Sequence, residues 1–436
     1  MRLNRLHWDK ADAKERAAAL ARPAATTDAM ADAAAIVGDV RRRGSVAVHE
    51  YSRRLDGYDA ADFRVPEAAL EAAGAALPAA DRDAILAAAG AVRRFHAPQG
   101  YQPYESEPWA GGRAERRVMP VGVAGLYVPA GTAPLISTLV MLAVPALLAG
   151  VPRIIVLSPP CGSYDSGGIH PTVLATAALL GLDEVYAVGG AHGIAALAYG
   201  AAGLPRADRI FGPGNAWVAA AKTLVAQEPG GPAIDLPAGP SEVMVIADDS
   251  ADAHFIAADL LSQAEHDPLA QVLLVARSAD FVGRVDDALD RFLADLPRAA
   301  IARASLRHGR AIIVADDAAA VTVANTYGPE HLIIQTTHPR PLADAIDRAG
   351  AIFIGPWSPE AAGDYAAGPN HVLPTGGAAR AYGGLTVEMF QRTCTVLDLS
   401  AAAASAMAPT VERLAALEGL QAHGLAMRLR RETAAP

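Results

Sequence analysis

The feature that most restricts the fold is a series of short apolar segments that alternate with helix-like segments and end in glycine or proline. The first series, residues 121–227, includes "VGVAGLYVP", "RIIVLSPP", "EVYAVGG" and "DRIFG". The second, residues 241–355, includes "SEVMVIAD", "QVLLVAR", "GRAIIVAD", "HLIIQT" and "AGAIFIG". Continuous apolar strands separated by helices are typical of parallel sheets that are buried on both faces. We therefore predict an α/β protein with two Rossmann-like, doubly wound domains.

Composition excludes several other classes of protein. The 436 residues are 52% hydrophobic and 19% charged, as in a globular chain. With a net charge of -10 and an isolated basic run at 41–44, no nucleic-acid partner is expected. The most apolar stretch, 135–151, contains a proline and is short for a membrane span, so no membrane association is expected. Two cysteines and the lack of an apolar leader favour a cytoplasmic location.

Glycine-rich turns follow two strands of the first series. "FGPGNAWVAAAKTL" and "VGGAHGIAA" each lead from a predicted strand into a predicted helix. Backbone N–H groups at a helix N-terminus bind phosphate where glycine lets the ligand approach. Each turn alone is equally compatible with a tight strand-to-helix connection, but two at one sheet edge favour a ligand of nucleotide size.

Acid–base and metal-ligating residues gather in and after the second series. Glu330 and His331 stand side by side before an apolar strand, and such a pair suits acid–base catalysis. In "DLLSQAEHDP", Gln263 and His266 are three residues apart and share a helix face. Asp364 lies in "SPEAAGDYAAGPNHVLPTGG", a Gly-rich segment that fits a binding loop better than a linker. A surface pair in a turn and a loop packed on itself are the structural alternatives.

Glu418 and His423 lie in the terminal helical segment "LEGLQAHG". Alone they are typical of a surface helix end, where the helix dipole favours histidine. The chain as a whole, however, resembles the histidinol dehydrogenase family, and the spacing from Glu418 to His423 matches as well. The other matching blocks are "GLYVPAGTAPLISTLVM", "AVGGAHGIAALAYG", "FGPGNAWV", "DLPAGPSEVMVIAD", "DLLSQAEHDP", "YGPEHL" and "GDYAAGPNHVLPTGG".

The resemblance implies a zinc enzyme with one Zn²⁺ per subunit. The positions that match the family's zinc ligands are Gln263, His266, Asp364 and His423. Oxygen and nitrogen ligands differ from the cysteines of a closed structural site and leave room for substrate. The substrate-contacting positions are these four residues together with Ser241, His331 and Glu418. In the family, the imidazole and amine of histidinol complete the coordination, so the metal holds the substrate and is not redox-active.

The reaction implied by the resemblance is the four-electron oxidation of L-histidinol to L-histidine, with two NAD⁺ reduced in turn. His331 matches the base that removes the hydroxyl proton, and Glu330 matches the residue that activates water for the aldehyde step. Tyr127, His192 and Asn215 match the NAD-contacting positions. The family usually has glutamine where this chain has His192, whose charge can change near neutral pH.

The expected division of the chain has five parts. They are a helical N-terminal arm (1–27), the first part of one α/β domain (28–126), a second, NAD-binding α/β domain (127–240), the rest of the first domain with the zinc and catalytic residues (241–381), and a helical C-terminal tail (382–436). Because the family is a homodimer, we expect the tail to reach the partner subunit's active site.

Three alternatives remain open. A cysteine-based aldehyde dehydrogenase needs an activated thiolate, and neither Cys161 nor Cys394 lies in a matching block. A paralogue with the same zinc and NAD site would oxidise another polar alcohol, such as a sulfonated diol, although Ser241 and Glu418 favour histidinol. A non-catalytic binding protein is disfavoured by the intact pair of Glu330 with the following histidine and by the complete ligand set.

Overall fold

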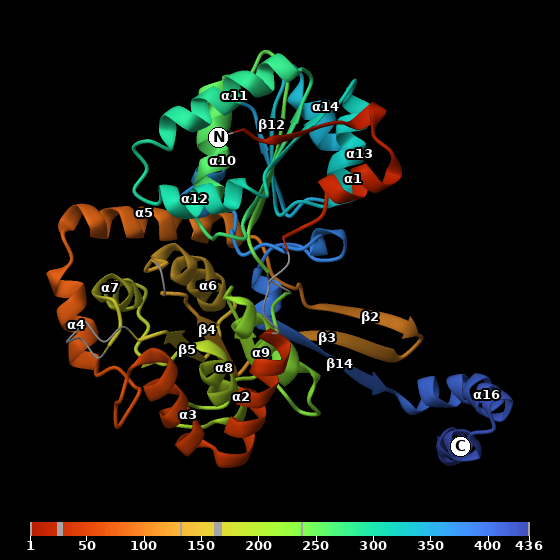
Figure 1. The fold of residues 1–436 in the computed structure, drawn as a ribbon. Coiled ribbons are helices and arrows are strands. Elements are labelled where there is room, and N and C mark those ends of the chain that lie inside the picture. Colours follow the sequence, from red (N-terminus) through yellow and green to blue (C-terminus); the bar gives the residue numbers. More distant parts are fainter. Residues whose placement is uncertain (1, 24–28, 131–132, 161–167, 237–238, 435–436) are drawn as a thin grey trace.

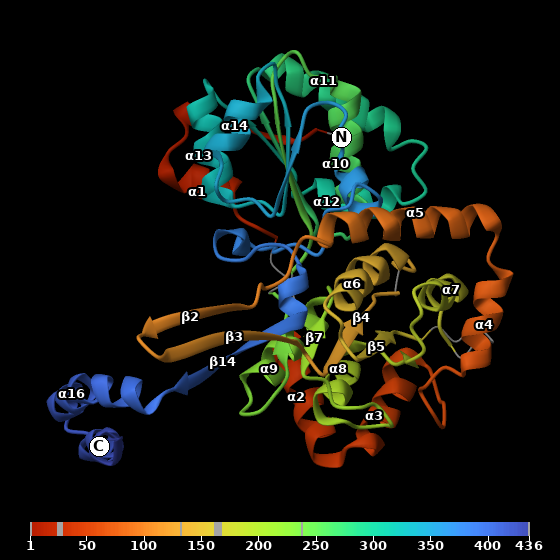
Figure 2. The same ribbon diagram turned by 180° about the vertical axis from the view of Figure 1, so that it is seen from behind.

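Two parallel sheets, each with helices on both faces, form two α/β bodies that lie one above the other in Figure 1. The computed structural model describes residues 2–23, 29–130, 133–160, 168–236 and 239–434. A third, antiparallel sheet and the C-terminal helices extend sideways from the bodies, as Figure 2 shows from behind. The predicted α/β class with two Rossmann-like domains is confirmed.

The upper body is built on a six-stranded parallel sheet in the order β1-β11-β10-β9-β12-β13. From β9 the chain moves outward through β10 and β11, then returns to the other side for β12 and β13, which is doubly wound topology. The strands are β1 (Asn4–His7), β9 (Glu242–Ala247), β10 (Gln271–Ala276), β11 (Arg310–Ile313), β12 (His331–Gln335) and β13 (Ala351–Ile354). The helices are α1 (Ala13–Ala19), α10 (Ala253–Ala264), α11 (Ala279–Phe292), α12 (Ala299–Leu306), α13 (Asp317–Tyr327), α14 (Pro339–Ala345) and α15 (Glu360–Tyr365).

Strand β9 is apolar at almost every position because both of its faces are buried. Val243 and Val245 belong to the core formed with α10, α11 and α12. Met244 and Ile246 belong to the core on the opposite face, formed with α13 and α14. Because side chains alternate between the faces of a strand, burial of both faces removes the polar positions that a half-exposed strand would show.

The lower body has a five-stranded parallel sheet in the order β6-β5-β4-β7-β8, again doubly wound, now from β4. Its strands are β4 (Val123–Tyr127), β5 (Arg153–Ser158), β6 (Val185–Ala187), β7 (Arg209–Phe211) and β8 (Ala233–Ile234). The helices between them are α6 (Ile136–Leu148), α7 (Pro171–Leu179), α8 (Gly190–Tyr199) and α9 (Ala216–Gln227).

Four helices from the N-terminal quarter of the chain pack onto this lower body. They are α2 (Ala29–Arg43), α3 (Ser45–Tyr51), α4 (Glu67–Ala76) and α5 (Ala79–His96). Helix α2 contacts α8 and α9, α4 contacts α7, and α5 contacts α6. This packing differs from the expected grouping of 28–126 with 241–381. The physical reason is that both sheets offer similar apolar helix layers, so a helix's own pattern does not reveal which sheet it covers.

Two segments expected to be helical also contribute strands. Strand β1 pairs in parallel with β11, which builds the start of the N-terminal arm into the upper sheet. The C-terminal tail contains strand β14 (Gln391–Leu399), which pairs with β3 (Gly112–Pro120) beside β2 (Tyr104–Trp109). Helices α16 (Ala401–Glu418) and α17 (Gln421–Ala434) follow and pack on each other, away from both bodies (Figure 1).

Within the described residues, no helix combines the length and apolar character that crossing a membrane requires.

Candidate active site

Helix α10 carries the first two predicted metal ligands at its C-terminal end. Gln263 is fully buried in the last turn, and His266 follows the end of the helix, where its N–H donates to the Gln263 carbonyl at 3.2 Å. The Gln263 side chain forms hydrogen bonds with the surrounding groups when its amide nitrogen donates to Glu360 Oε1 at 2.8 Å. Its oxygen then lies 3.3 Å from His266 Nδ1. The two side chains therefore meet, as their spacing predicts.

Helix α15 and the loop after it supply the acidic side of the site. Asp364 Oδ1 lies 3.6 Å from Nε2 of His331, the first residue of β12. The carbonyl of Asp364 accepts a hydrogen bond from His371 Nδ1 at 2.8 Å. His371 Nε2 lies 3.4 Å from the hydroxyl of Thr138 in α6, so this loop bridges the two bodies.

The donor set fits a divalent metal ion such as zinc. Ligand atoms at 2.0–2.1 Å from a tetrahedral Zn²⁺ lie roughly 3.3 Å from one another, which is the spacing of the Gln263 oxygen and His266 Nδ1. Ligand atoms of His331, Glu360 and Asp364 also lie within 4.8 Å of one another. The contact between the Gln263 amide and Glu360 joins the two groups, so nitrogen and oxygen donors gather at one place.

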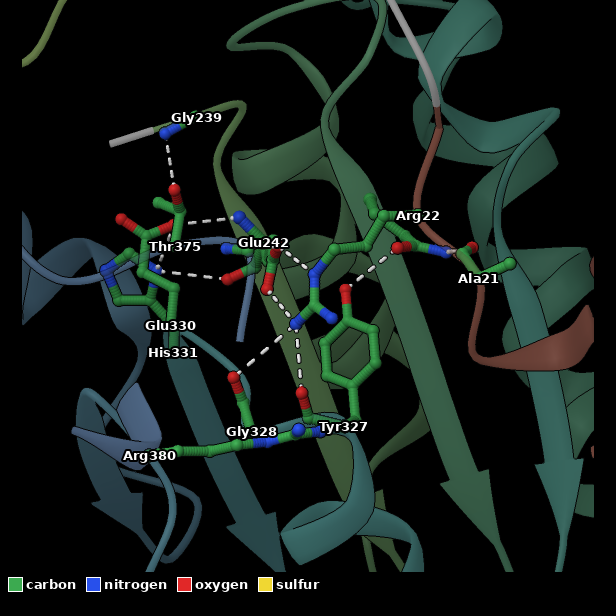
Figure 3. A network of polar contacts seen from close by, with 12 residues as sticks. Ala21, Arg22, Gly239, Glu242, Tyr327, Gly328, Glu330, His331, Thr375 and Arg380 are labelled. Atoms are coloured by element: carbon green, nitrogen blue, oxygen red, sulfur yellow. Dashed lines mark hydrogen bonds and ion pairs between the residues drawn. The ribbon is translucent and has the colours of Figure 1, made fainter. Parts of the chain in front are cut away.

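The Glu330–His331 pair is held by the backbone at the start of β9. The N–H of Glu242 donates to Glu330 Oε2 at 2.8 Å, and the Glu242 carbonyl accepts from His331 Nδ1 at 3.2 Å (Figure 3). With its proton on Nδ1, His331 leaves Nε2 free to accept one. That Nε2 is buried and has no hydrogen-bond partner among the described residues. The predicted pair is therefore assembled with one nitrogen aimed at the metal-binding cluster.

Burial dominates the electrostatics of the pair. It lowers the pKa of His331 to about 4, against the raising effect of the Asp364 charge, so the imidazole is neutral at physiological pH. Burial also raises the pKa of Glu330 well above its ordinary value, and the charges of Glu242 and Asp364 act in the same direction. The imidazole is therefore in the unprotonated form that a general base needs.

The three predicted NAD-contacting residues lie at or after the carboxyl ends of strands in the lower sheet. Tyr127 ends β4, and its buried hydroxyl accepts a hydrogen bond from the Gly190 N–H at 3.2 Å. Burial raises its pKa to about 12. His192 lies in the first turn of α8 and is buried, with Nε2 3.1 Å from Asp56 Oδ2. Asn215 is exposed and caps α9 by accepting from the Val218 N–H at 3.0 Å.

The glycine turn between β7 and α9 is fixed by a buried ion pair. Lys222 Nζ donates to the Gly212 carbonyl at 2.7 Å and to Asp235 Oδ1 at 2.5 Å, while the Gly212 N–H donates to Asp235 Oδ2 at 2.7 Å. Gly212 has a φ of +110°, and a Cβ there would lie 2.2 Å from the Tyr127 carbonyl oxygen. Both the backbone conformation and the close approach require glycine.

The tail residues lie apart from the rest of the predicted site within one chain. Glu418 ends α16 and His423 lies in the first turn of α17, and both are exposed. Figure 1 places these helices at the far end of the antiparallel sheet. Of the remaining predicted residues, Ser241 immediately precedes β9, and its carbonyl accepts from the Gln271 N–H at 3.1 Å. The single chain thus assembles Gln263 and the body residues of the predicted site but not its tail residues.

Known proteins resemble this chain along nearly its full length. Residues 20–431 match the histidinol dehydrogenase family. The chain belongs to the histidinol dehydrogenase family. It is 45% identical over 427 residues to histidinol dehydrogenase of Salmonella typhimurium, covering 98% of this chain and 97% of the relative. It is 44% identical over 427 residues to that of Escherichia coli K12, with the same coverage.

A solved structure of a histidinol dehydrogenase, from Elizabethkingia anophelis, superposes with a TM-score of 0.91 at 35% identity. The superposition covers 99% of this chain and 98% of that one. This family membership leaves little support for the cysteine-based alternative. Cys394 is exposed on β14, and Cys161 lies outside the described residues.

Sequence reasoning missed several buried polar residues of the site. Glu360 is fully buried and four residues before Asp364 on α15, a spacing that could have indicated a shared helix face. Asp259, four residues before Gln263, is 6% exposed and accepts from the Gln335 amide at 3.1 Å. Burial raises the pKa of Asp259 to about 7. His371 stood in a quoted Gly-rich segment without an assigned role.

Proposed function

We propose that the protein catalyses the oxidation of L-histidinol to L-histidine through the aldehyde, with a bound zinc ion and two molecules of NAD⁺, in the cytoplasm. Family membership supports the oxidoreductase activity and its place in histidine biosynthesis. The observation that carries the mechanism is the buried Nε2 of His331, which has no hydrogen-bond partner in the described part of the chain and lies beside the cluster of nitrogen and oxygen donors. A base placed next to metal ligands suits a substrate whose alcohol must lose a proton.

His331 is the proposed base for the alcohol step. Its Nδ1–H is held by the Glu242 carbonyl, so Nε2 takes the hydroxyl proton while hydride leaves the alcohol carbon for NAD⁺. The products are the aldehyde, NADH and one proton. Because burial keeps the imidazole neutral, it can accept that proton at physiological pH.

Glu330 is the proposed base for the aldehyde step. Its carboxylate takes a proton from water as the water oxygen bonds to the aldehyde carbon, and His331 returns the proton it took in the alcohol step to the aldehyde oxygen, which forms the hydrate. A second hydride then leaves for the second NAD⁺, and His331 takes the remaining hydroxyl proton. Burial raises the pKa of Glu330, and the hydrogen bond from the Glu242 N–H to Oε2 opposes this shift and orients the carboxylate.

Gln263, His266 and Asp364 are the body residues that would hold the zinc ion, with His423 as the fourth ligand. When bound, zinc supplies an electron-pair acceptor that orients the imidazole and amine of histidinol. Glu360 accepts the Gln263 amide N–H and so turns the amide oxygen toward His266. Ser241, Glu418 and His331 would contact the substrate.

The lower body is the proposed NAD-binding domain. Tyr127 and the Gly212 turn follow β4 and β7, the adjacent strands at which the strand order reverses. Dinucleotides bind at such a switch point, with the pyrophosphate at a helix N-terminus. Asn215 at the start of α9 and His192 in the first turn of α8 are the further proposed contacts.

The tail supports a homodimer with shared active sites. Leu414, Leu417, Leu420 and Leu425 are large apolar side chains that α16 and α17 leave exposed. Such a surface is typical of a protein–protein interface. Because Glu418 and His423 lie on these helices, we propose that the tail of one subunit completes the site of its partner.

The direct test of the function is to count NADH formed per L-histidinol consumed by the zinc-loaded protein. We expect a ratio near two, because the alcohol and aldehyde steps each reduce one NAD⁺. A sulfonated diol is the matched comparison substrate. Turnover of the diol without turnover of histidinol would replace this proposal with the paralogue alternative.

The shared site is tested by subunit exchange between inactive His331→Ala and inactive His423→Ala proteins. If tails act in trans, each mixed dimer has one site with both lesions and one with none. Random pairing makes half the dimers mixed, so activity should recover to ~1/4 of wild type. If tails act in cis, every site keeps one lesion, and confirmed exchange without recovery would exclude sharing.

A further inference from the structure

The backbone of Glu242 supports both proposed catalytic residues, and its side chain lies at the centre of a larger network. The carboxylate is buried, with 4% of the side chain exposed. It accepts from Arg22 Nε at 2.5 Å and from Arg22 Nη2 at 2.9 Å, which is a bidentate contact. It also accepts from the Gly376 N–H at 2.9 Å. Figure 3 shows this network beside Glu330 and His331.

Arg22 also fixes the chain that leads into the catalytic pair. Its Nη2 donates to the carbonyl of Tyr327 at 3.0 Å, and its guanidinium lies 3.9 Å from the centre of the Tyr327 ring. Tyr327 ends α13 and is three residues from Glu330. The Tyr327 hydroxyl donates to Gln271 Oε1 at 2.8 Å in β10. One arginine from the N-terminal arm thus joins the start of β9 to the segment before β12.

From these contacts we infer that the Arg22–Glu242 ion pair positions Glu330 and His331 for proton transfer. The inference rests on the proposed roles of those two residues. The N–H and C=O of Glu242 reach the catalytic side chains, and the bidentate contact holds this peptide against the chain segment that carries them. Arg22 and Glu242 touch no reacting atom, so both are positioning residues.

Stability alone is a weak reason for such a pair. Two well-packed apolar residues often replace a buried ion pair at little or no cost, whereas removal of one partner is strongly destabilising. A positioning role therefore predicts that stability and catalysis respond differently when both charges are removed. The double variant Arg22→Met/Glu242→Gln tests this difference, because residue 242 keeps its backbone N–H and C=O.

The N-terminal arm provides a matched control. Arg5 Nη2 lies 2.9 Å from Asp286 Oδ2, and the Asp286 side chain is 1% exposed. This pair joins the same arm to α11 and does not contact the catalytic residues. Arg5→Met therefore measures the effect of loosening the arm and removing the Arg5 partner of a buried carboxylate, without disturbing Glu242.

The experiment compares wild type, Arg22→Met, Arg22→Lys, the double variant and Arg5→Met. For each protein, kcat and KM are measured with histidinol and with NAD⁺, together with the thermal midpoint and bound zinc. We expect Arg22→Met to lower kcat on the order of 10²-fold, with KM for histidinol and zinc content close to wild type. The double variant should recover the wild-type thermal midpoint but not the wild-type kcat.

Arg22→Lys keeps the charge but loses the fork of donors, so its kcat should lie between wild type and Arg22→Met. Arg5→Met should lose stability at unchanged kcat per folded molecule. Recovery of kcat together with stability in the double variant, or equal kcat in Arg22→Met and Arg5→Met, would overturn the inference. Wild-type protein inactive on histidinol would instead contradict the proposed function, so the two failures are distinguishable.

Discussion

Removal of Lys222 should lower the stability of the lower body, by an amount that follows from the burial of its ion pair with Asp235. The two side chains are 4% and 1% exposed. Lys222→Met would leave the Asp235 carboxylate buried without its cation, which typically costs about 3–5 kcal/mol. For a body of roughly 150–250 residues, each kcal/mol lowers the melting temperature by about 2–4 °C. We therefore expect the melting temperature of this body to fall by about 6–20 °C.

Differential scanning calorimetry of the single and double variants measures this effect. Lys222→Met/Asp235→Asn removes both charges and should recover part of the loss. About 1–3 kcal/mol should remain because the Gly212 carbonyl loses its donor. A loss of less than about 1 kcal/mol in Lys222→Met would refute the reasoning. Since the pair fixes the Gly212 turn, KM for NAD⁺ should also rise while bound zinc stays unchanged.

Four further predictions concern the site. His266→Ala should abolish or greatly weaken zinc binding because a nitrogen ligand is lost; elemental analysis checks this, with the exposed His254→Ala at the other end of α10 as control. Glu330→Gln should slow aldehyde oxidation on the order of 10²–10⁴-fold and alcohol oxidation less, and equal slowing in separate assays of the two steps would contradict the division of labour. Asp259→Asn should be more stable than wild type at pH 8, by at most about 4 kcal/mol, but not at pH 4. The reason is that burial raises the folded pKa of Asp259 to about 7, so wild-type stability falls as pH rises from about 4 through 7; urea unfolding at both pH values measures this. His192→Gln should change KM for NAD⁺ while KM for histidinol stays close to wild type, and steady-state kinetics with an identical KM for NAD⁺ would place His192 outside the cofactor site.

Patterns within the sequence were sufficient to predict the two α/β bodies and many of their elements. Helix α9 (Ala216–Gln227) follows the glycine turn of "FGPGNAWVAAAKTL", where the sequence predicts a helix. Apolar runs predict buried strands from local sequence alone, because a strand that is covered on both faces needs apolar side chains at every position. The contact between Gln263 and His266 was predictable for the same reason: three residues separate them near one helix end. Roles at the single positions came from resemblance to a family.

The tertiary structure decided which distant segments meet. Arg22 and Glu242 are 220 residues apart, and no local pattern indicates that an arm residue holds the carboxylate beside the catalytic pair. The catalytic pair Glu330–His331 also does not lie where ligands usually bind in such sheets, which is at the carboxyl ends of the strands. His331 and Glu242 begin their strands, so this part of the site lies at the amino edge of the upper sheet.

The assignment of helices to sheets was likewise decided by the structure. Helices α2 to α5 cover the lower body, and strand β1 extends the upper sheet, although both precede the two strand series in the chain. Apolar patterning states that a face must be buried but not against which partner, because the hydrophobic effect is non-directional. The partner is selected by complementary packing across the folded body, a property that belongs to many residues together and is absent from any single stretch of sequence.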